Sequence, residues 1–425
     1  MLAARWKPSM VDMSLSLRER RVMVPPNVVV VLADDLGVGD LSPYGSRLIR
    51  TPAMTRLAAN GVVCEAMYAA ASTDTPSRAG LLTGRYGARY GLPASTGPGT
   101  DAGLPPDAVT VAKLLGSAGY ATGLFGQWRL GAQPGRHPLD HGFGRFEGTL
   151  YGTDVTPLAW YEGRKAVVDD ADPAQSARHL TDAALDFVDD HRDGPFLAVL
   201  SHLGPHAPYR VEPRFHGASA AGAYGDLVEQ LDHYLGVLLR HLDRRRLTRR
   251  TLVIVTSDNG PRYEGRTQER RGRKPEVFDG GVRVPFLASW PSVTRRTRDA
   301  TPRSLLDLTP SLCALAGVGP PDGLDGEDMS ALLSGRPSPG RGPVYLFFDQ
   351  WLNAVRSDRW KLHVAFGADR TAYMPQLFDV TADVREAYNL AALHPGVVER
   401  LRGPLEELRD DVAAEAAARK ETTTV

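Results

Sequence analysis

A chain of 425 residues is long enough for one large α/β domain with an appendage, or for about two or three domains of average size. Fifty basic residues balance fifty acidic ones, and the hydrophobic and charged fractions, 42% and 24%, are those of an ordinary globular protein. The net charge therefore gives no indication of nucleic acid as a partner. Since no run reaches about 18 apolar residues, the sequence predicts no membrane span.

The N-terminal residues 1–26 are expected to form a leader outside the fold. Arg20 and Arg21 precede an apolar run, VMVPPNVVVVLA, that superficially resembles a twin-Arg export signal. Cleavage behind this run would remove the first core strand, so we predict a cytoplasmic protein. Cys64 and Cys313 lie in apolar contexts and are expected to be buried free thiols, which fits a reducing compartment.

From residue 27 onward, buried-strand patterns alternate with helical patterns, which predicts a parallel sheet with helices on both faces. The strands are predicted at 27–34, 120–126, 195–202 and 251–258. The first and the last are rich in β-branched residues, as strands buried on both faces are. Helical patterns lie at 109–119, 180–191 and 224–245. The last of these places five leucines on one stripe: Leu227, Leu231, Leu235, Leu238 and Leu239.

A break rich in Pro, Gly and Ser, SGRPSPGRGP, follows Leu333 and introduces a different pattern. Short strand-like segments at 344–349, 353–358, 359–364 and 375–380 precede one helix around 397–417. This order predicts a small α+β unit with an antiparallel sheet. We therefore expect a leader at 1–26, a mixed, mainly parallel α/β domain at 27–335, an α+β domain at 336–415 and a disordered tail at 416–425.

Polar side chains follow the predicted strands at the edge where open α/β sheets bind ligands. The first strand ends in Asp34-Asp35 and the last in Asp258-Asn259. Oxygen-only ligands favour Ca²⁺ or Mg²⁺, because zinc prefers more His or Cys. Asp and Asn are also common where a loop begins or a helix is capped, which is the alternative explanation for each residue alone. Their pairing at two strand ends favours a metal site.

The stretch ASTDTPSRAGLLTGRY, residues 71–86, indicates a loop that turns into a helix. Pro76 suits the first turn of a helix, and an oxyanion can lie at a helix N-terminus, where free N–H groups and the helix dipole point. Arg78 adds a fork of donors that fits sulfate or phosphate. Taken alone the motif is weak, because Thr-Pro-Ser is a common helix start.

Together these elements resemble the sulfatase family of the alkaline phosphatase superfamily, over nearly all of residues 27–410. The family signature, Cys-x-Pro-Ser-Arg followed by Leu-Thr-Gly-Arg, stands here at 74–78 and 82–85. Other matching segments are 34–35, 205–208, 258–260, Lys274 with 279–285, 354–363 and 376–391. The resemblance implies a metal at the Asp and Asn positions, and contacts of His206 and Lys274 with a bound anion.

Three positions depart from the family pattern. In the family the signature Cys, or sometimes Ser, becomes formylglycine, whose hydrated aldehyde attacks sulfur; here the position is Asp74, which cannot be converted. The Lys and His of the family element Gly-Lys-Trp-His-Leu-Gly are Gln127 and Arg129. A milder change puts Asp279 where Glu is usual. The altered groups are those that the resemblance links to bond breaking, which indicates altered use rather than random decay.

Three roles for Asp74 stay open. A carboxylate can be a nucleophile, more readily in phosphoryl transfer than towards a sulfate ester. It can also be an additional metal ligand. In the third role it pairs with Arg129, which is permanently charged and cannot replace His as a general acid or base. Thr73 and Thr75 are less suited as nucleophiles, because the spacing to Pro-Ser-Arg puts Asp74 at the expected position.

These observations predict a divalent-metal-dependent enzyme of this family that acts on a sulfate or phosphate ester, or a related small anion, without formylglycine. The alternative is a protein of this fold without hydrolysis, either a pseudoenzyme that binds an anion or a partner, or a repurposed biosynthetic enzyme. The expected cofactor is Ca²⁺, or Mg²⁺ or Mn²⁺. The expected partner is a small anionic molecule, with no nucleic acid and no membrane, and the oligomeric state is left open.

The candidate site residues fall into three overlapping groups. The predicted metal ligands are Asp34, Asp35, Asp74, Asp258 and Asn259. The predicted catalytic residues are Asp74, Arg78, Arg129, His206 and Lys274. The predicted anion-binding residues are Arg78, Gln127, Arg129, His206 and Lys274. His202 is interpreted as a core or rim histidine, and the basic stretch 262–274, apart from Lys274, as a solvated surface.

Overall fold

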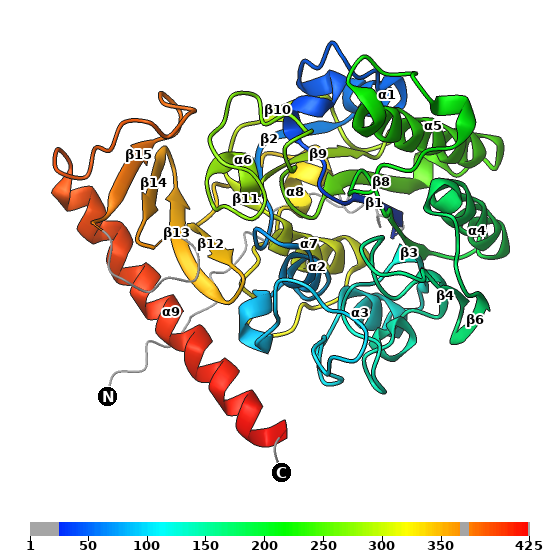
Figure 1. Ribbon diagram of the computed structural model, residues 1–425, viewed down its shortest axis with the longest axis horizontal. Coiled ribbons are helices and arrows are strands. Elements are labelled where there is room, and N and C mark those ends of the chain that lie inside the picture. The colour runs from blue at the N-terminus through cyan, green and yellow to red at the C-terminus, as the bar shows by residue number, and fades with distance from the viewer. Residues whose placement is uncertain (1–24, 366–373, 424–425) are drawn as a thin grey trace, which may run out of the picture.

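A twisted central sheet organises the first three quarters of the chain (Figure 1). The computed structural model describes residues 25–365 and 374–423, so most of the predicted leader lies outside the described residues. The strand order is β10-β2-β9-β8-β1-β7-β3-β4-β5-β6, with β11 paired to β2. The four strands predicted from the sequence form its parallel centre, namely β1 (Asn27–Ala33), β3 (Ala121–Gln127), β7 (Phe196–Ser201) and β8 (Thr251–Ser257).

The remaining strands extend this centre on both sides. β9 is antiparallel to both β8 and β2, and β4 is parallel to β3, which makes the sheet mixed and mainly parallel. The added strands are β2 (Val62–Tyr68), β4 (Arg145–Thr149), β5 (Trp160–Glu162), β6 (Lys165–Val168), β9 (Arg283–Ser289), β10 (Thr297–Asp299) and β11 (Arg303–Ser304).

Alternate residues of β1 enter two separate cores, because successive side chains of a strand point to opposite faces. Val28, Val30 and Leu32 pack in one apolar cluster, whereas Val29 and Val31 pack in the other. Helices cover both faces (Figure 1). One face carries α1 (Pro52–Ala59), α4 (Ser176–Asp190) and α5 (Gly222–Arg244), and the other carries α2 (Asp74–Thr83), α3 (Val111–Ser117) and α7 (Leu308–Ala316). Two short helices, α6 (Asp279–Val282) and α8 (Ser330–Leu333), complete this domain.

A four-stranded antiparallel sheet follows the Pro/Gly/Ser-rich break, as predicted. Its strands are β12 (Val344–Phe348), β13 (Trp351–Ser357), β14 (Trp360–His363) and β15 (Gln376–Asp379). The helix α9 (Pro395–Thr423) lies alongside this sheet and extends past it to the large domain (Figure 1). The predicted fold class is therefore confirmed, with a large mixed sheet between helices and a separate small antiparallel sheet.

The disordered tail predicted from residue 416 is wrong for residues 416–423, which continue α9. Residues 413–420, AAEAAARK, are strong helix formers, and the helix continues through them. The polar ending KETTTV was therefore a poor indicator of where the helix stops. Arg419 also ties this end to the large domain, with its guanidinium 2.8 Å from the carboxylate of Asp107.

Two further expectations meet the structure here. Cys64 and Cys313 are both buried free thiols, and burial raises the pKa of the Cys313 thiol to about 11. Among the described residues, no helix combines the length and the apolar character that crossing a membrane requires. The cytoplasmic location stays a prediction.

Candidate functional site

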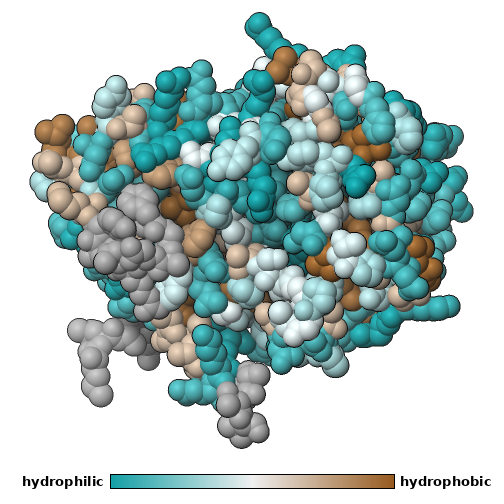
Figure 2. Space-filling view, in the orientation of Figure 1, coloured by the Kyte–Doolittle hydropathy of each residue, from teal (hydrophilic) through white to brown (hydrophobic). Residues whose placement is uncertain are grey.

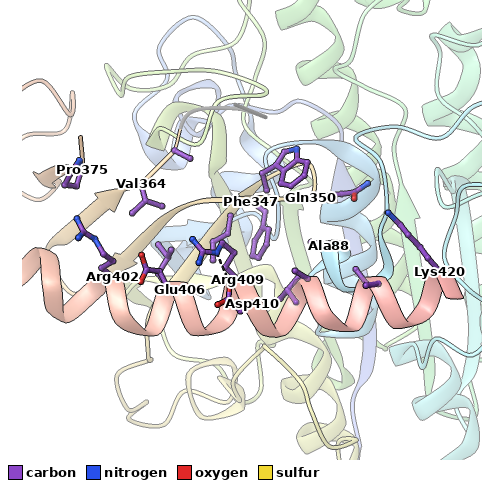
Figure 3. A pocket seen from close by; sticks show the side chains of 18 of the residues that line it. Ala88, Phe347, Gln350, Val364, Pro375, Arg402, Glu406, Arg409, Asp410 and Lys420 are labelled. Atoms are coloured by element: carbon purple, nitrogen blue, oxygen red, sulfur yellow. Dashed lines mark hydrogen bonds and ion pairs between the residues drawn. The ribbon is translucent and has the colours of Figure 1, made fainter. Parts of the chain in front are cut away.

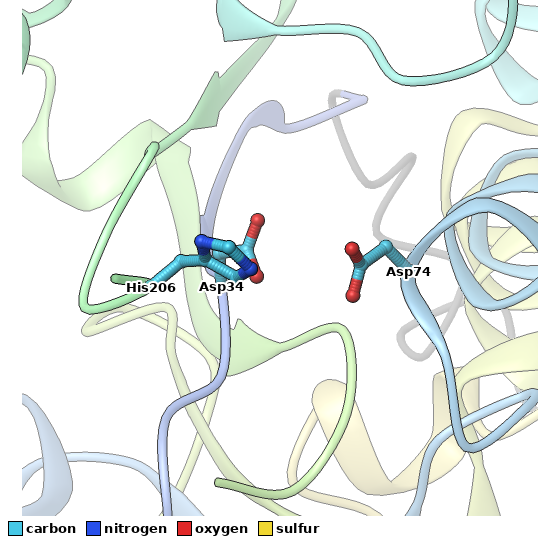
Figure 4. Close-up of side chains that lie close together, drawn as sticks. All are labelled: Asp34, Asp74 and His206. Atoms are coloured by element: carbon cyan, nitrogen blue, oxygen red, sulfur yellow. The ribbon is translucent and has the colours of Figure 1, made fainter. Parts of the chain in front are cut away.

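Four carboxylates meet at the carboxyl ends of the central strands. Asp34 and Asp35 follow β1, Asp258 follows β8, and Asp74 begins α2. Each offers one oxygen such that the four oxygens lie within 4.8 Å of one another, and all four residues are buried. Figure 4 shows the Asp74 carboxylate pointing across the site towards Asp34 and His206. We call these four residues the carboxylate cluster.

Three buried oxygen atoms of this region accept no hydrogen bond from the described residues. They are Asp34 Oδ1, Asp35 Oδ2 and Asn259 Oδ1. Buried oxygens without a donor are rare in folded proteins, because their desolvation is then uncompensated. Carboxylate and amide oxygens are also the ligands that Ca²⁺ and Mg²⁺ prefer. The donor set therefore fits a divalent cation, whereas the full set of predicted ligands and the identity of the metal stay predictions.

Asp74 lies between two cations. One carboxylate oxygen contacts the Lys274 ammonium, and the other lies 3.0 Å from the Arg129 guanidinium. The predicted contact between Asp74 and Arg129 is therefore present. Burial and the neighbouring Asp34 raise the pKa of Asp74, but Lys274 and Arg129 outweigh them and hold it below its ordinary value. Asp74 is thus an ionised carboxylate with both oxygens in ion pairs.

Arg129 is surrounded by acceptors on all sides. Besides Asp74, its side chain donates to Asp154 at 2.9 Å and to Gln127 Oε1 at 3.0 Å, and it lies 3.5 Å from Asp34. Its backbone has a positive φ of 59°, and its carbonyl accepts hydrogen bonds from the Thr75 hydroxyl at 2.9 Å. The side chain is only 2% exposed, which leaves it little freedom.

Gln127 ends β3, and its side-chain amide bridges two strand ends, whereas the anion contact predicted for it stays a prediction. Its Nε2 donates to Asp34 and to the carbonyl of His202. The preceding Gly126 lets β3 approach β7 closely, since a Cβ there would lie 1.9 Å from the Ser201 carbonyl oxygen. Gln127 carries no charge but supplies a donor for Asp34.

Arg78 lies beneath the cluster. Its three donor groups go to Asp258 (2.8 Å), to the Ser201 hydroxyl (2.7 Å) and to Asp34 (3.2 Å). The side chain is 2% exposed, so these contacts fix the two carboxylates in place. The anion contact predicted for Arg78 stays a prediction, because the described contacts use its fork to orient acidic residues.

Lys274 and His206 reach the cluster from two loops. The Lys274 ammonium lies 2.6 Å from Asp35 Oδ1, and its neighbours Asp74 and Asp35 raise the pKa of the amine although burial lowers it. His206 Nδ1 bonds the carbonyl oxygen of Ala207, which can only accept, so this nitrogen carries the proton. Its Nε2 faces the site, 3.9 Å from Asp35 Oδ2. His202 is buried away from the ion pairs, as expected of a core histidine, and burial lowers its pKa to about 4.

The acids of the cluster differ in how well their charge is compensated. Burial raises the pKa of Asp258 to about 8, with Asp34 adding to the effect and Arg78 opposing it. Burial also raises the pKa of Asp35 against the attraction of Lys274. Burial acts in the same direction on Asp34, but Arg129, His206 and Lys274 together hold the pKa of that carboxyl well below its ordinary value. Asp34 and Asp74 therefore have their negative charge well compensated, whereas burial leaves Asp35 and Asp258 less well compensated by Lys274 and Arg78.

Sequence reasoning missed three residues of the site. Asp154 follows β4, Ser201 ends β7, and the Arg262 guanidinium lies 3.4 Å from Asp35 Oδ2. The rule that ligands follow strand ends would have found Asp154, but β4 (RFEGT) has no apolar run and was not predicted as a strand. Arg262 was assigned to the solvated surface, which its 54% exposure partly supports.

A hollow of about 970 Å³ lies elsewhere, between α9 and the small sheet (Figure 3). Its lining includes Phe347, Leu352, Leu405 and Arg409, and it contains none of the predicted site residues. The face of the molecule in Figure 2 is mostly hydrophilic, with apolar residues in small separate groups. The chemistry of the site therefore points to the carboxylate cluster and not to this hollow.

Comparison with known proteins agrees with this geometry. The sulfatase family model matches residues 26–318. The steryl-sulfatase of Mus musculus is 35% identical over 429 aligned positions, which cover 78% of this chain and 69% of the relative. The arylsulfatase A of Bos taurus is also 35% identical, with 86% of this chain and 83% of the relative covered. A solved structure from the glycosaminoglycan metabolism of Bacteroides thetaiotaomicron has a TM-score of 0.81 at 27% identity, and covers 91% of this chain and 99% of that one. The chain belongs to the sulfatase family.

Proposed function

We propose that this chain is a divalent-metal-dependent hydrolase that acts on a small sulfate or phosphate ester and does not use formylglycine. The observation that carries the proposal is the carboxylate cluster, in which two buried oxygens accept no hydrogen bond from the described residues. The relatives of the chain are sulfatases. Asp74 stands at the position that the family signature reserves for the formylglycine precursor, and an Asp side chain cannot become an aldehyde.

Asp34, Asp35, Asp74, Asp258 and Asn259 would hold the cation, with Ca²⁺ the metal that we expect first and Mg²⁺ or Mn²⁺ as alternatives. A bound divalent cation stabilises negative charge on an ester oxygen. Lys274 and Arg129 add fixed positive charge beside it and would orient the anionic group. His206 presents Nε2 to the site, and its doubly protonated imidazolium would be the candidate to deliver the Nε2 proton to the leaving oxygen.

For Asp74 we favour the role of metal ligand and ion-pair partner over that of nucleophile. Both of its oxygens are engaged by cations, which lowers the nucleophilicity of a group that is already a weak nucleophile. Arg129 cannot take a proton in turn, so it does not replace the family histidine as a base.

One observation favours a second candidate function, in which the protein binds an anion without hydrolysing it. Asp74 already neutralises the two cations that would meet the substrate, and Arg129 is further bound by Asp154. A protein of this fold with these ion pairs intact would retain its metal but turn over no ester. This candidate covers both a pseudoenzyme and a repurposed biosynthetic enzyme.

Hydrolysis assays with and without chelator separate the two candidates. The purified protein is given panels of aryl sulfates, phosphate monoesters and phosphodiesters, before and after metal removal. Turnover that chelation abolishes and added Ca²⁺ restores supports the hydrolase, and its persistence in Asp74→Ala would exclude a nucleophilic Asp74. Bound metal without turnover of any ester would reject the hydrolase and favour the second candidate.

A further inference from the structure

Glu386 is a completely buried acid of the C-terminal domain that holds a segment of the large domain. Its Oε2 accepts a hydrogen bond from the backbone N–H of Asp279 at 2.7 Å, and its carbonyl accepts one from Arg271 at 3.0 Å. Asp279 begins α6, and Arg271 lies eight residues earlier. Glu386 therefore accepts hydrogen bonds from both ends of the segment 271–279.

Two residues of the strand β14 also contact Glu386. Glu386 Oε1 lies 2.9 Å from His363 Nε2 and 3.1 Å from the Lys361 ammonium, and Lys361 also lies 2.9 Å from the Asp279 carboxylate. The four residues Asp279, Lys361, His363 and Glu386, which we call the interdomain cluster, are at most 2% exposed. A network of this kind fixes the relative position of the elements that contribute to it.

The segment 271–279 is a closed loop that carries Lys274. The N–H of Gly280 donates to the Arg271 carbonyl at 2.8 Å, and the Arg271 guanidinium lies 3.9 Å from the centre of the Phe278 ring. At the tip of the loop, the N–H of Lys274 donates to the Pro261 carbonyl at 3.1 Å. The side chain of Lys274 then reaches Asp35 and Asp74.

We propose that Glu386 is a positioning residue for the Lys274 ammonium, so that the C-terminal domain sets the charge balance of the carboxylate cluster. The inference rests on the proposed metal site. The ammonium lies on carboxylates that would also bind the cation, so a firmly held lysine competes with the metal. Loosening of the loop lowers the effective concentration of the ammonium at the carboxylates.

The direction of the effect distinguishes positioning from general damage. A variant that merely loosens the site binds Ca²⁺ more weakly, because its ligands are less well ordered. A variant that releases only Lys274 binds Ca²⁺ more tightly, because a competing positive charge is withdrawn. Lys274→Met, which removes the ammonium, sets the upper limit of this gain.

The test uses the full-length protein with two loosening variants and one control. Glu386→Gln keeps the size of the side chain but removes its charge. Arg271→Ala removes the contact to the Glu386 carbonyl at an exposed residue, so it keeps the test valid if Glu386→Gln fails to fold. The control Asp307→Asn changes another buried acid, which pairs with Arg341 and has no contact with the loop.

Two quantities are measured for each variant. Calorimetry gives the dissociation constant for Ca²⁺, and mass spectrometry gives the rate at which an acylating reagent modifies Lys274, whose side chain is 6% exposed. We expect both loosening variants to lower the dissociation constant by about threefold to tenfold and to raise the acylation rate by a similar factor. Asp307→Asn should change neither quantity.

Each other outcome overturns the inference. Unchanged Ca²⁺ affinity and unchanged acylation in both loosening variants would show that Glu386 does not position Lys274, and weaker Ca²⁺ binding would show general damage. If the wild-type protein binds no Ca²⁺, the proposed metal site has failed by itself. The acylation rate then decides the inference alone, and an unchanged rate contradicts it.

Discussion

The carboxylate cluster and the interdomain cluster are both buried groups of acids, but they differ in whether every carboxylate oxygen accepts a hydrogen bond from the protein. Every carboxylate oxygen of Asp279 and Glu386 accepts a hydrogen bond from the protein, from donors that include Tyr68, Lys361 and Arg283. In the carboxylate cluster, Asp34 Oδ1 and Asp35 Oδ2 accept none from the described residues. Complete pairing is typical of a structural network, whereas buried oxygens without donors indicate a place for a ligand.

The two clusters also differ in the pKa shifts of their acids. Burial raises the pKa of Asp279, but Lys361 and Arg283 outweigh it and hold that pKa below its ordinary value. In the carboxylate cluster the acids diverge: the pKa values of Asp34 and Asp74 are lowered, whereas burial raises that of Asp35, and that of Asp258 to about 8. Lys361 and Arg283 thus compensate Asp279, whereas Asp35 and Asp258 are less well compensated, as expected where a divalent cation binds.

The largest expected effect lies in the interdomain cluster. Lys361→Met leaves two buried carboxylates without their shared cation and should lower the free energy of unfolding by roughly 3–5 kcal/mol. Urea denaturation followed by circular dichroism measures the loss. A change below about 1 kcal/mol would mean that this cluster is not the structural network described above.

Removal of a charge from the carboxylate cluster should weaken Ca²⁺ binding rather than lower stability. Asp35→Asn is expected to weaken Ca²⁺ binding by about tenfold to a hundredfold, as loss of a ligand does. In metal-free protein the same change relieves repulsion among like charges, so the free energy of unfolding should stay constant or rise. Calorimetry and denaturation of the same sample test both parts, and a large loss of stability without loss of affinity would reverse the assignment of the two clusters.

The pair Asp74–Arg129 tests whether these two buried residues act together. In metal-free protein, a double-mutant cycle of Asp74→Ala and Arg129→Ala should give a coupling free energy of about 1–3 kcal/mol, because the pair is buried and 3.0 Å apart. Arg129→Ala should therefore destabilise the wild-type protein more than it destabilises Asp74→Ala. Equal effects in the two backgrounds would show that the contact contributes nothing.

The smallest effect is expected at the entrance of the site. Arg262 is 54% exposed and lies 3.4 Å from Asp35, so solvent screens its charge. Arg262→Ala should tighten Ca²⁺ binding by less than about threefold. A tenfold change would place Arg262 among the residues that control the cluster, in contrast to its exposed position.

The sequence was sufficient for those parts of the site that depend on local patterns. Buried-strand patterns predicted the four central strands, those of β1 and β8 being rich in β-branched residues, and the strand-end rule then grouped Asp34, Asp35, Asp258 and Asn259. β9 was missed because Pro285 and the preceding glycines conceal its strand pattern, and β4 because it has no apolar run.

Contacts between distant segments were harder to foresee. The motif predicted an anion contact for Arg78, which stays a prediction, but it did not indicate that the donors go to Asp34, Ser201 and Asp258, which lie between 44 and 180 positions away. No local pattern indicates which of several acceptors a buried guanidinium will choose. The same reason explains why Glu386 went unnoticed, since its partners lie in β14 and α6 and its own surroundings look like a polar loop.

The metal stoichiometry of the purified protein tests the central claim most directly. Metal-free protein is titrated with Ca²⁺ by calorimetry, beside Asp258→Asn, and bound metal is counted by mass spectrometry of the dialysed complex. A metal site at the carboxylate cluster predicts one divalent cation per chain in the wild-type protein and a loss of affinity of about tenfold or more in the variant. Wild-type protein that binds no divalent cation, or a variant that binds it equally well, would contradict a metal site there.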